Sequence, residues 1–148
     1  MATNELPGID GLFWWKDKQI LVFVVCGRVF YASSLTGTPT EISSESMRLN
    51  INRKVHFAAT DSMLFMANGG TILKWTGSGT LEKEATDLTP TYCNGLVIFQ
   101  QRLLAVEENT QRIHLTEAIE EKDTSVTWKP TWFTPNSNRS EEHTSELQ

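Results

Sequence analysis

Short runs of β-branched, aromatic and aliphatic residues alternate with Gly, Asn, Asp and Ser along almost the whole chain. Such runs, bounded by turn-forming residues, are typical of β-strands, whereas the 3.6-residue period of an amphipathic helix is almost absent. The first unit is predicted to contain strands at residues 12–16, 20–25 and 28–32. Turns at Asp17-Lys18 and Cys26-Gly27 join these strands into an antiparallel meander.

The same arrangement recurs twice along the chain. Strands are predicted at residues 55–59, 63–67 and 71–76 in the second unit and at residues 96–99, 102–106 and 112–116 in the third. A weaker fourth segment follows in each unit, around residues 38–43, 81–86 and 126–133. Aligning the second strands brings Leu21, Leu64 and Leu103 into register, at separations of 43 and 39 residues.

Repeats of about 40 residues with four antiparallel strands each match the blades of a β-propeller. We therefore expect an all-β fold of consecutive antiparallel β-meanders, a partial β-propeller of about three blades that occupies residues 1–138. A β-sandwich is the alternative that the spacing leaves open. Because three blades do not close a ring, we expect the chain to be a fragment whose natural protein continues past Asn138.

The last ten residues, 139–148, resemble the translation of a common sequencing adapter in every codon. We expect them to be a non-native tail, and they are excluded from functional reasoning as an expression tag would be. His143 is therefore not considered as a ligand.

The composition argues against several classes of protein. The 148 residues carry 13 Lys and Arg against 18 Asp and Glu, a net charge of −5, so the general electrostatic attraction of a tight DNA binder is missing. The longest apolar run, residues 20–26, is far shorter than the roughly 20 residues that a membrane-spanning helix needs. Cys26 and Cys93 have no metal-ligand spacing and are expected to be free thiols.

No residue pattern points to catalysis. His56 and His114 fall in strands of separate units, where packing is the usual role of a histidine. The glycines at residues 69–70 and 77–79 fit turns and match no phosphate-binding motif. We predict that the protein is not an enzyme and that it has no catalytic residues, no metal site and no cofactor.

Aromatic residues are the remaining candidates for function. Large aromatic side chains fill sheet-to-sheet contacts and also anchor protein partners. The candidates for an inter-blade or partner surface are Trp14, Trp15, Trp128, Trp132 and Phe133.

Several segments, in order and spacing, resemble the packaged-DNA stabilisation proteins of short-tailed phages, also called tail accessory or nozzle proteins. The similarity covers most of residues 9–136 and rests on structural segments, with no catalytic signature. It is carried by residues 11–18, 28–31, 55–58, 69–70, 86–87 and 111–117, together with Trp75, Pro90, Trp128 and Phe133. Cys26, before a turn glycine, and the charged loop at residues 120–123 depart from the pattern.

The resemblance implies a structural virion protein that closes the portal exit channel after genome packaging and forms part of the tail conduit for DNA ejection. Its partners would be the portal adaptor and other tail proteins, in a homo-oligomeric ring located in the virion tail after assembly in the host cytoplasm. DNA would pass through without specific binding, which the acidic charge suits. A propeller-type protein-interaction module is the alternative, and a fragment of a propeller enzyme is a more distant one.

Overall fold

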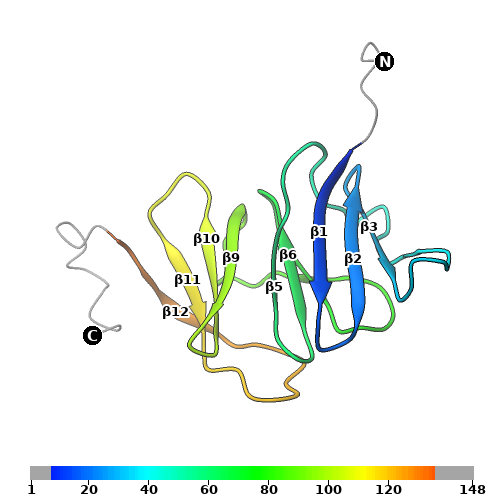
Figure 1. The fold of residues 1–148 in the computed structure, drawn as a ribbon. Helices are drawn as coiled ribbons and strands as arrows, with labels where there is room; N and C mark the ends of the chain where they lie inside the picture. Colours follow the sequence, from blue (N-terminus) through cyan, green and yellow to red (C-terminus); the bar gives the residue numbers. More distant parts are fainter. Residues whose placement is uncertain (1–7, 136–148) are drawn as a thin grey trace, which may run out of the picture.

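The computed structural model describes residues 8–135, which form twelve β-strands and no helix. Consecutive strands build three four-stranded antiparallel sheets (Figure 1). The first sheet comprises β1 (Ile9–Trp15), β2 (Ile20–Val25), β3 (Arg28–Ala32) and β4 (Thr40–Glu41). The second comprises β5 (His56–Ala59), β6 (Leu64–Ala67), β7 (Ile72–Trp75) and β8 (Glu82–Glu84). The third comprises β9 (Cys93–Phe99), β10 (Arg102–Glu107), β11 (Ile113–Thr116) and β12 (Trp128–Phe133).

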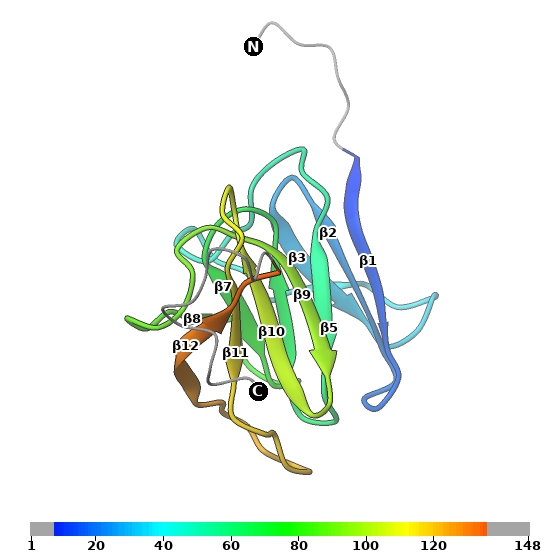
Figure 2. The same ribbon diagram turned by 90° about the vertical axis from the view of Figure 1, so that its left-hand side faces the viewer.

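The predicted all-β succession of antiparallel meanders is confirmed. Leu21, Leu64 and Leu103 each lie in the second strand of a separate sheet, as the repeat spacing predicts. The first strands, β1, β5 and β9, lie next to one another in both views (Figure 1 and Figure 2), as they do in successive propeller blades. The expected end of the domain at Asn138 and the expected tail at residues 139–148 lie outside the described residues.

Glycine is required at two of the turns. Gly27, between β2 and β3, has a φ of 77°, and a Cβ there would collide with the carbonyl oxygen of Leu49. Gly69, between β6 and β7, has a φ of 106°, and a Cβ there would collide with the guanidinium of Arg53. Both positions combine a left-handed backbone with a close neighbour, so any side chain is strained there.

Strands β6 and β7 of the second sheet are buried on both faces, because the other two sheets cover them. Successive side chains of β6 point to opposite faces of the sheet. Leu64 and Met66 pack into a cluster shared with the first sheet, whereas Phe65 and Ala67 pack into a cluster shared with the third. All four residues of β6 are therefore buried. This packing accounts for a continuous apolar run where a half-exposed strand would alternate with polar residues.

Candidate functional site

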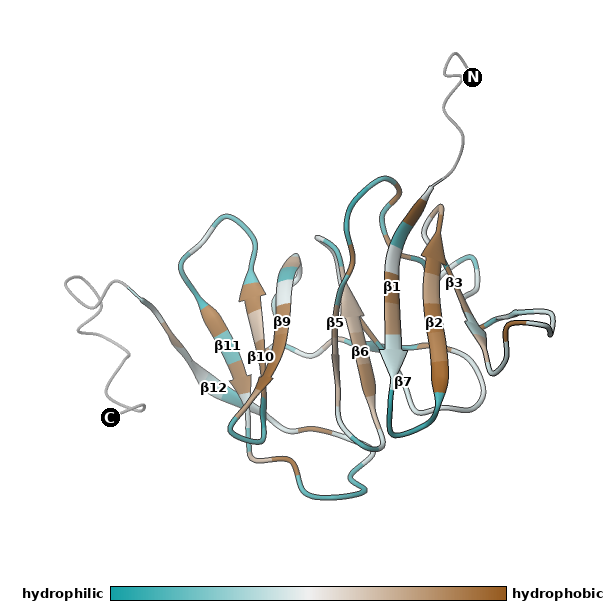
Figure 3. Cartoon of the chain, in the orientation of Figure 1, coloured by the Kyte–Doolittle hydropathy of each residue, from teal (hydrophilic) through white to brown (hydrophobic). Residues whose placement is uncertain are grey.

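Apolar side chains line the face of the first sheet that points away from the second. Leu12 pairs with Phe23 and Trp14 pairs with Leu21 across β1 and β2. Phe23 stacks on Phe30 of β3, with ring centroids 5.6 Å apart. Figure 3 shows β2 as hydrophobic along its length, in keeping with apolar residues on both of its faces. We call this set the first outer face: Leu12, Trp14, Leu21, Phe23 and Phe30.

Comparison with the equivalent positions of the other two sheets shows that the first outer face resembles a sheet-to-sheet contact surface. Leu64 and Leu103, the equivalents of Leu21, are fully buried against the preceding sheet. Leu21 occupies the same register position, but no sheet among the described residues precedes its own, and it is only half-buried. Leu12 and Trp14 beside it are 64% and 51% exposed. The first outer face therefore has the composition of a sheet-to-sheet contact without the covering sheet.

A second apolar face lies at the other end of the stack. Val97 of β9 pairs with Leu104 of β10, and Val106 pairs with Ile113 of β11. These residues alternate with Leu103 and Ala105, which are buried against the second sheet, so they point away from it. We call this set the third outer face: Val97, Phe99, Leu104, Val106, Ile113 and Phe133. Val97 and Phe99 are 51% and 56% exposed.

The five aromatic candidates divide between the interior and the surface. Trp15 is buried between the first and second sheets, and Trp128 is buried between the second and third. Trp132 is half-buried, with the Arg112 guanidinium 4.5 Å from its ring centroid. Trp14 and Phe133 are exposed and belong to the first and third outer faces, respectively.

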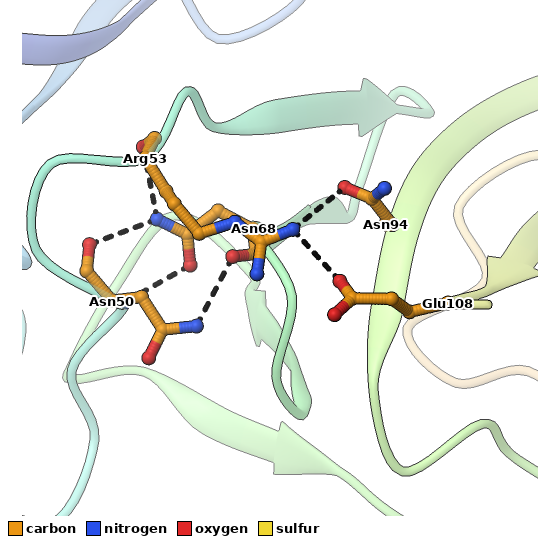
Figure 4. A network of polar contacts seen from close by, with 5 residues as sticks. All are labelled: Asn50, Arg53, Asn68, Asn94 and Glu108. Atoms are coloured by element: carbon orange, nitrogen blue, oxygen red, sulfur yellow. Dashed lines mark hydrogen bonds and ion pairs between the residues drawn. The ribbon is translucent and has the colours of Figure 1, made fainter.

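A polar junction joins the segment between the first and second sheets to the second and third sheets (Figure 4). Asn68 is 1% exposed, and its Oδ1 accepts a hydrogen bond from the backbone N–H of Asn50 at 2.9 Å. Its Nδ2 donates to the carbonyls of Asn50 and Arg53 at 2.9 and 3.1 Å. The Arg53 guanidinium then donates to Glu108 at 2.7 Å and to Asn94 at 3.3 Å. One side chain thus satisfies the backbone of the connecting segment, and one cation ties that segment to the third unit.

Sequence reasoning missed this junction. Asn68 precedes Gly69-Gly70, and the three residues together signal only a hairpin turn. The partners of Asn68 and Arg53 lie 15 to 55 positions away, so no local pattern marks them. A buried asparagine is recognisable as structural only once the backbone groups around it are placed.

Two side chains of the types that bind metals, His114 and Cys93, are buried. His114 is buried, and its Nε2 lies 2.7 Å from Oε1 of Glu107. Burial raises the pKa of the Cys93 thiol to about 11, and both cysteines are free. Residues 8–135 contain no group of three or more His, Cys, Asp or Glu side chains placed to hold a metal ion. Over the same residues there is no helix long and apolar enough to cross a membrane.

An ion pair perturbs one half-buried carboxylate, Glu41, at the edge of the first sheet. Arg28 donates two hydrogen bonds to Glu41, at 2.6 and 3.0 Å, and the Ser43 hydroxyl donates a third at 2.7 Å. These donors stabilise the charged form and lower the pKa of Glu41 to about 2. The pair anchors the two-residue strand β4 beside β3, where little backbone pairing is available.

No family model and no curated protein matches the sequence. Among solved structures, a chain in the crystal structure of a nidogen/laminin complex matches with a TM-score of 0.48 and 16% sequence identity. The match covers 84% of this chain, which spans about half, 50%, of that one. A likeness at this level carries no conclusion about family or function.

Proposed function

We propose that this chain is a structural protein of a short-tailed phage virion, of the packaged-DNA stabilisation type. In this role it helps to close the portal exit channel after packaging and forms part of the tail conduit. In this role, copies of the chain form a homo-oligomeric ring. Their binding partners are the portal adaptor and other tail proteins. The sequence resemblance over most of residues 9–136 is the source of this assignment.

The two outer faces are the structural observation that supports an assembly role best. A soluble monomer rarely leaves contiguous large apolar patches exposed, and such patches mark protein contacts. Here each face belongs to a repeat whose equivalent surfaces are covered by another sheet of the same chain. These two faces are therefore suited to holding the β-sheets of an assembly together.

The net charge of the chain supports a passive conduit. The chain carries a net charge of −5, so phosphate groups passing by meet no general attraction. Each neutralised phosphate would add salt-sensitive affinity, which hinders passage of a genome. An acidic protein with apolar contact faces therefore suits a channel component better than a nucleic-acid-binding protein.

The gene and its neighbours provide the decisive test. We expect portal, terminase and tail genes beside it, and we expect its complete product to co-sediment with the portal and adaptor proteins that they encode. Co-sedimentation should weaken when Phe23 of the first outer face is replaced by Glu and should persist when the loop residue Leu35, 93% exposed, is replaced by Glu. The proposal would be overturned if the neighbouring genes were unrelated to phage assembly, or if the gene product did not co-sediment with portal complexes. Binding to other proteins in that case would favour the interaction-module alternative.

A further inference from the structure

A cavity of about 210 Å³ lies beside the polar junction, at the first and second units. Its walls come from the segment between β4 and β5, from the turn between β6 and β7, and from β7 and β8. The residues that line it include Ser46, Arg48, Asn50, Thr71, Leu73 and Lys83. Asn50 is fixed in this wall because its Nδ2 donates to the carbonyl of Asn68 at 3.1 Å.

The charge of the cavity is positive. Arg48 and Lys83 line it, and none of its lining residues is acidic. Arg48 is close enough to Glu41 to help lower the pKa of that carboxyl. The Glu41 carboxylate, however, is already bound by Arg28 and Ser43. Among residues 8–135, neither Arg48 nor Lys83 forms a salt bridge with a carboxylate.

The pleat of the second sheet keeps neighbouring acids away. Lys83 pairs with Leu73, on the face that points to the first sheet, whereas Glu82 and Glu84 alternate to the opposite face. On that face the two carboxylates flank Lys74, with Nζ to oxygen distances of 3.7 and 4.0 Å. Acidic and basic residues adjacent in sequence are thus separated by the sheet, which leaves Lys83 available on the cavity side.

Size and donor chemistry select the ligand. Pockets for drug-sized molecules span roughly 300 to 1,000 Å³, so this cavity suits a smaller group. An arginine fork binds two oxygens of a planar or tetrahedral oxyanion, and a lysine adds a point charge. Ser46 and Thr71, which also line the cavity, carry hydroxyl groups that can donate hydrogen bonds. We propose that this cavity binds a small oxyanion, specifically a phosphate group.

Titration calorimetry of the 148-residue chain with inorganic phosphate at low salt tests the site. We expect saturable binding of one phosphate per chain, weakened at least tenfold by Arg48→Gln and by Lys83→Gln. Lys54→Gln, an exposed cation outside the cavity, is the matched control and should leave the dissociation constant unchanged. Thermal melts of each variant establish that it is folded.

A second arm identifies the source of the phosphate group. A nucleoside monophosphate is titrated in parallel, with amide NMR shifts at Thr71 and Lys83 as the readout. Equal affinity for both probes means that the free ion is recognised, and tighter binding of the ester means that a nucleotide phosphate is. Failure of both probes to saturate, or equal affinity in the wild-type chain and both cavity variants, would overturn the proposal.

Discussion

The indole Nε1 of Trp128 donates a hydrogen bond to Oε2 of Glu84 at 2.9 Å. Trp128 begins β12 and Glu84 ends β8, so the bond joins the last strands of the third and second sheets. The indole of Trp15 acts similarly at the other contact, donating to the carbonyl of Thr60 at 2.9 Å. Each sheet-to-sheet contact therefore combines an apolar indole body with one directional bond, which fixes how neighbouring sheets are aligned.

Replacing Trp128 by Phe should lower the free energy of unfolding by about 2 kcal/mol. A smaller aromatic ring is kept, but the Glu84 carboxylate loses a charge-assisted bond in a half-buried position. Urea denaturation monitored by circular dichroism measures the change. Trp14→Phe, at a 51% exposed position, is the control and should stay within about 0.5 kcal/mol of wild type. Equal stabilities for the two variants would show that the bond does not hold the sheets together.

Replacing Asn68 by Ala should lower the free energy of unfolding by about 2 to 3 kcal/mol. Its amide makes three hydrogen bonds to backbone groups, and their loss leaves buried donors and acceptors unpaired. Asn94→Ala is the matched control, because Asn94 is exposed and its side chain accepts only the longer bond from Arg53. We expect that variant to change stability by less than about 0.5 kcal/mol. Similar losses in both would mean that the junction is stabilised mainly through Arg53.

The Cys93 thiol should make the protein less stable in alkaline solution. Burial raises its pKa from 9.0 to about 11, so between these values the unfolded chain loses the proton that the folded chain retains. Stability contributed by the neutral thiol is complete below about pH 9 and declines as the pH approaches 11, by about 3 kcal/mol in total. Cys93→Ala should flatten this part of the curve, measured by urea midpoints from pH 8 to 11. An unchanged slope in the variant would assign the decline to other groups.

The strand pattern could be predicted from sequence because each hairpin is local. Runs of apolar residues and turns such as Asn68-Gly69 determine three meanders without reference to anything distant. The start of β9 at Cys93, earlier than the predicted residue 96, depends on a nonlocal bridge in which Cys93 pairs with Gly70. Boundaries that depend on another sheet are not encoded in the local run.

The sites were less predictable for the same reason. Trp14 and Trp15 are neighbours in sequence, yet one is 51% exposed and the other 1% exposed. The alternation of a strand dictates that they point to opposite faces, but only the placement of the second sheet determines which face is covered. Likewise, the cavity at Arg48 and Lys83 joins residues whose partners cannot be inferred from either segment alone.

The two outer faces should make the isolated chain self-associate. The first outer face corresponds to surfaces that in the second and third sheets pack against a preceding sheet, and the third outer face corresponds to surfaces that pack against a following one. The two faces are therefore complementary sides of the same type of sheet-to-sheet contact. A head-to-tail arrangement of copies can bring the first outer face of one copy against the third outer face of the next. Burial of apolar surface supplies about 25 cal/mol for every Å² removed from water, which favours such an arrangement.

Sedimentation velocity over a range of concentrations measures this association. Phe23→Glu on the first outer face and Val97→Glu on the third should each shift the chain toward monomer, because a charge in a sheet-to-sheet contact loses its hydration. Leu35→Glu adds the same charge at a loop position that is 93% exposed and should leave the distribution unchanged. A head-to-tail contact predicts one further result. Neither variant alone should form dimers, but a mixture of the two should, since each variant keeps one intact face. A wild-type chain that remains monomeric at every concentration, or mixed variants that stay monomeric, would show that the outer faces do not bind each other.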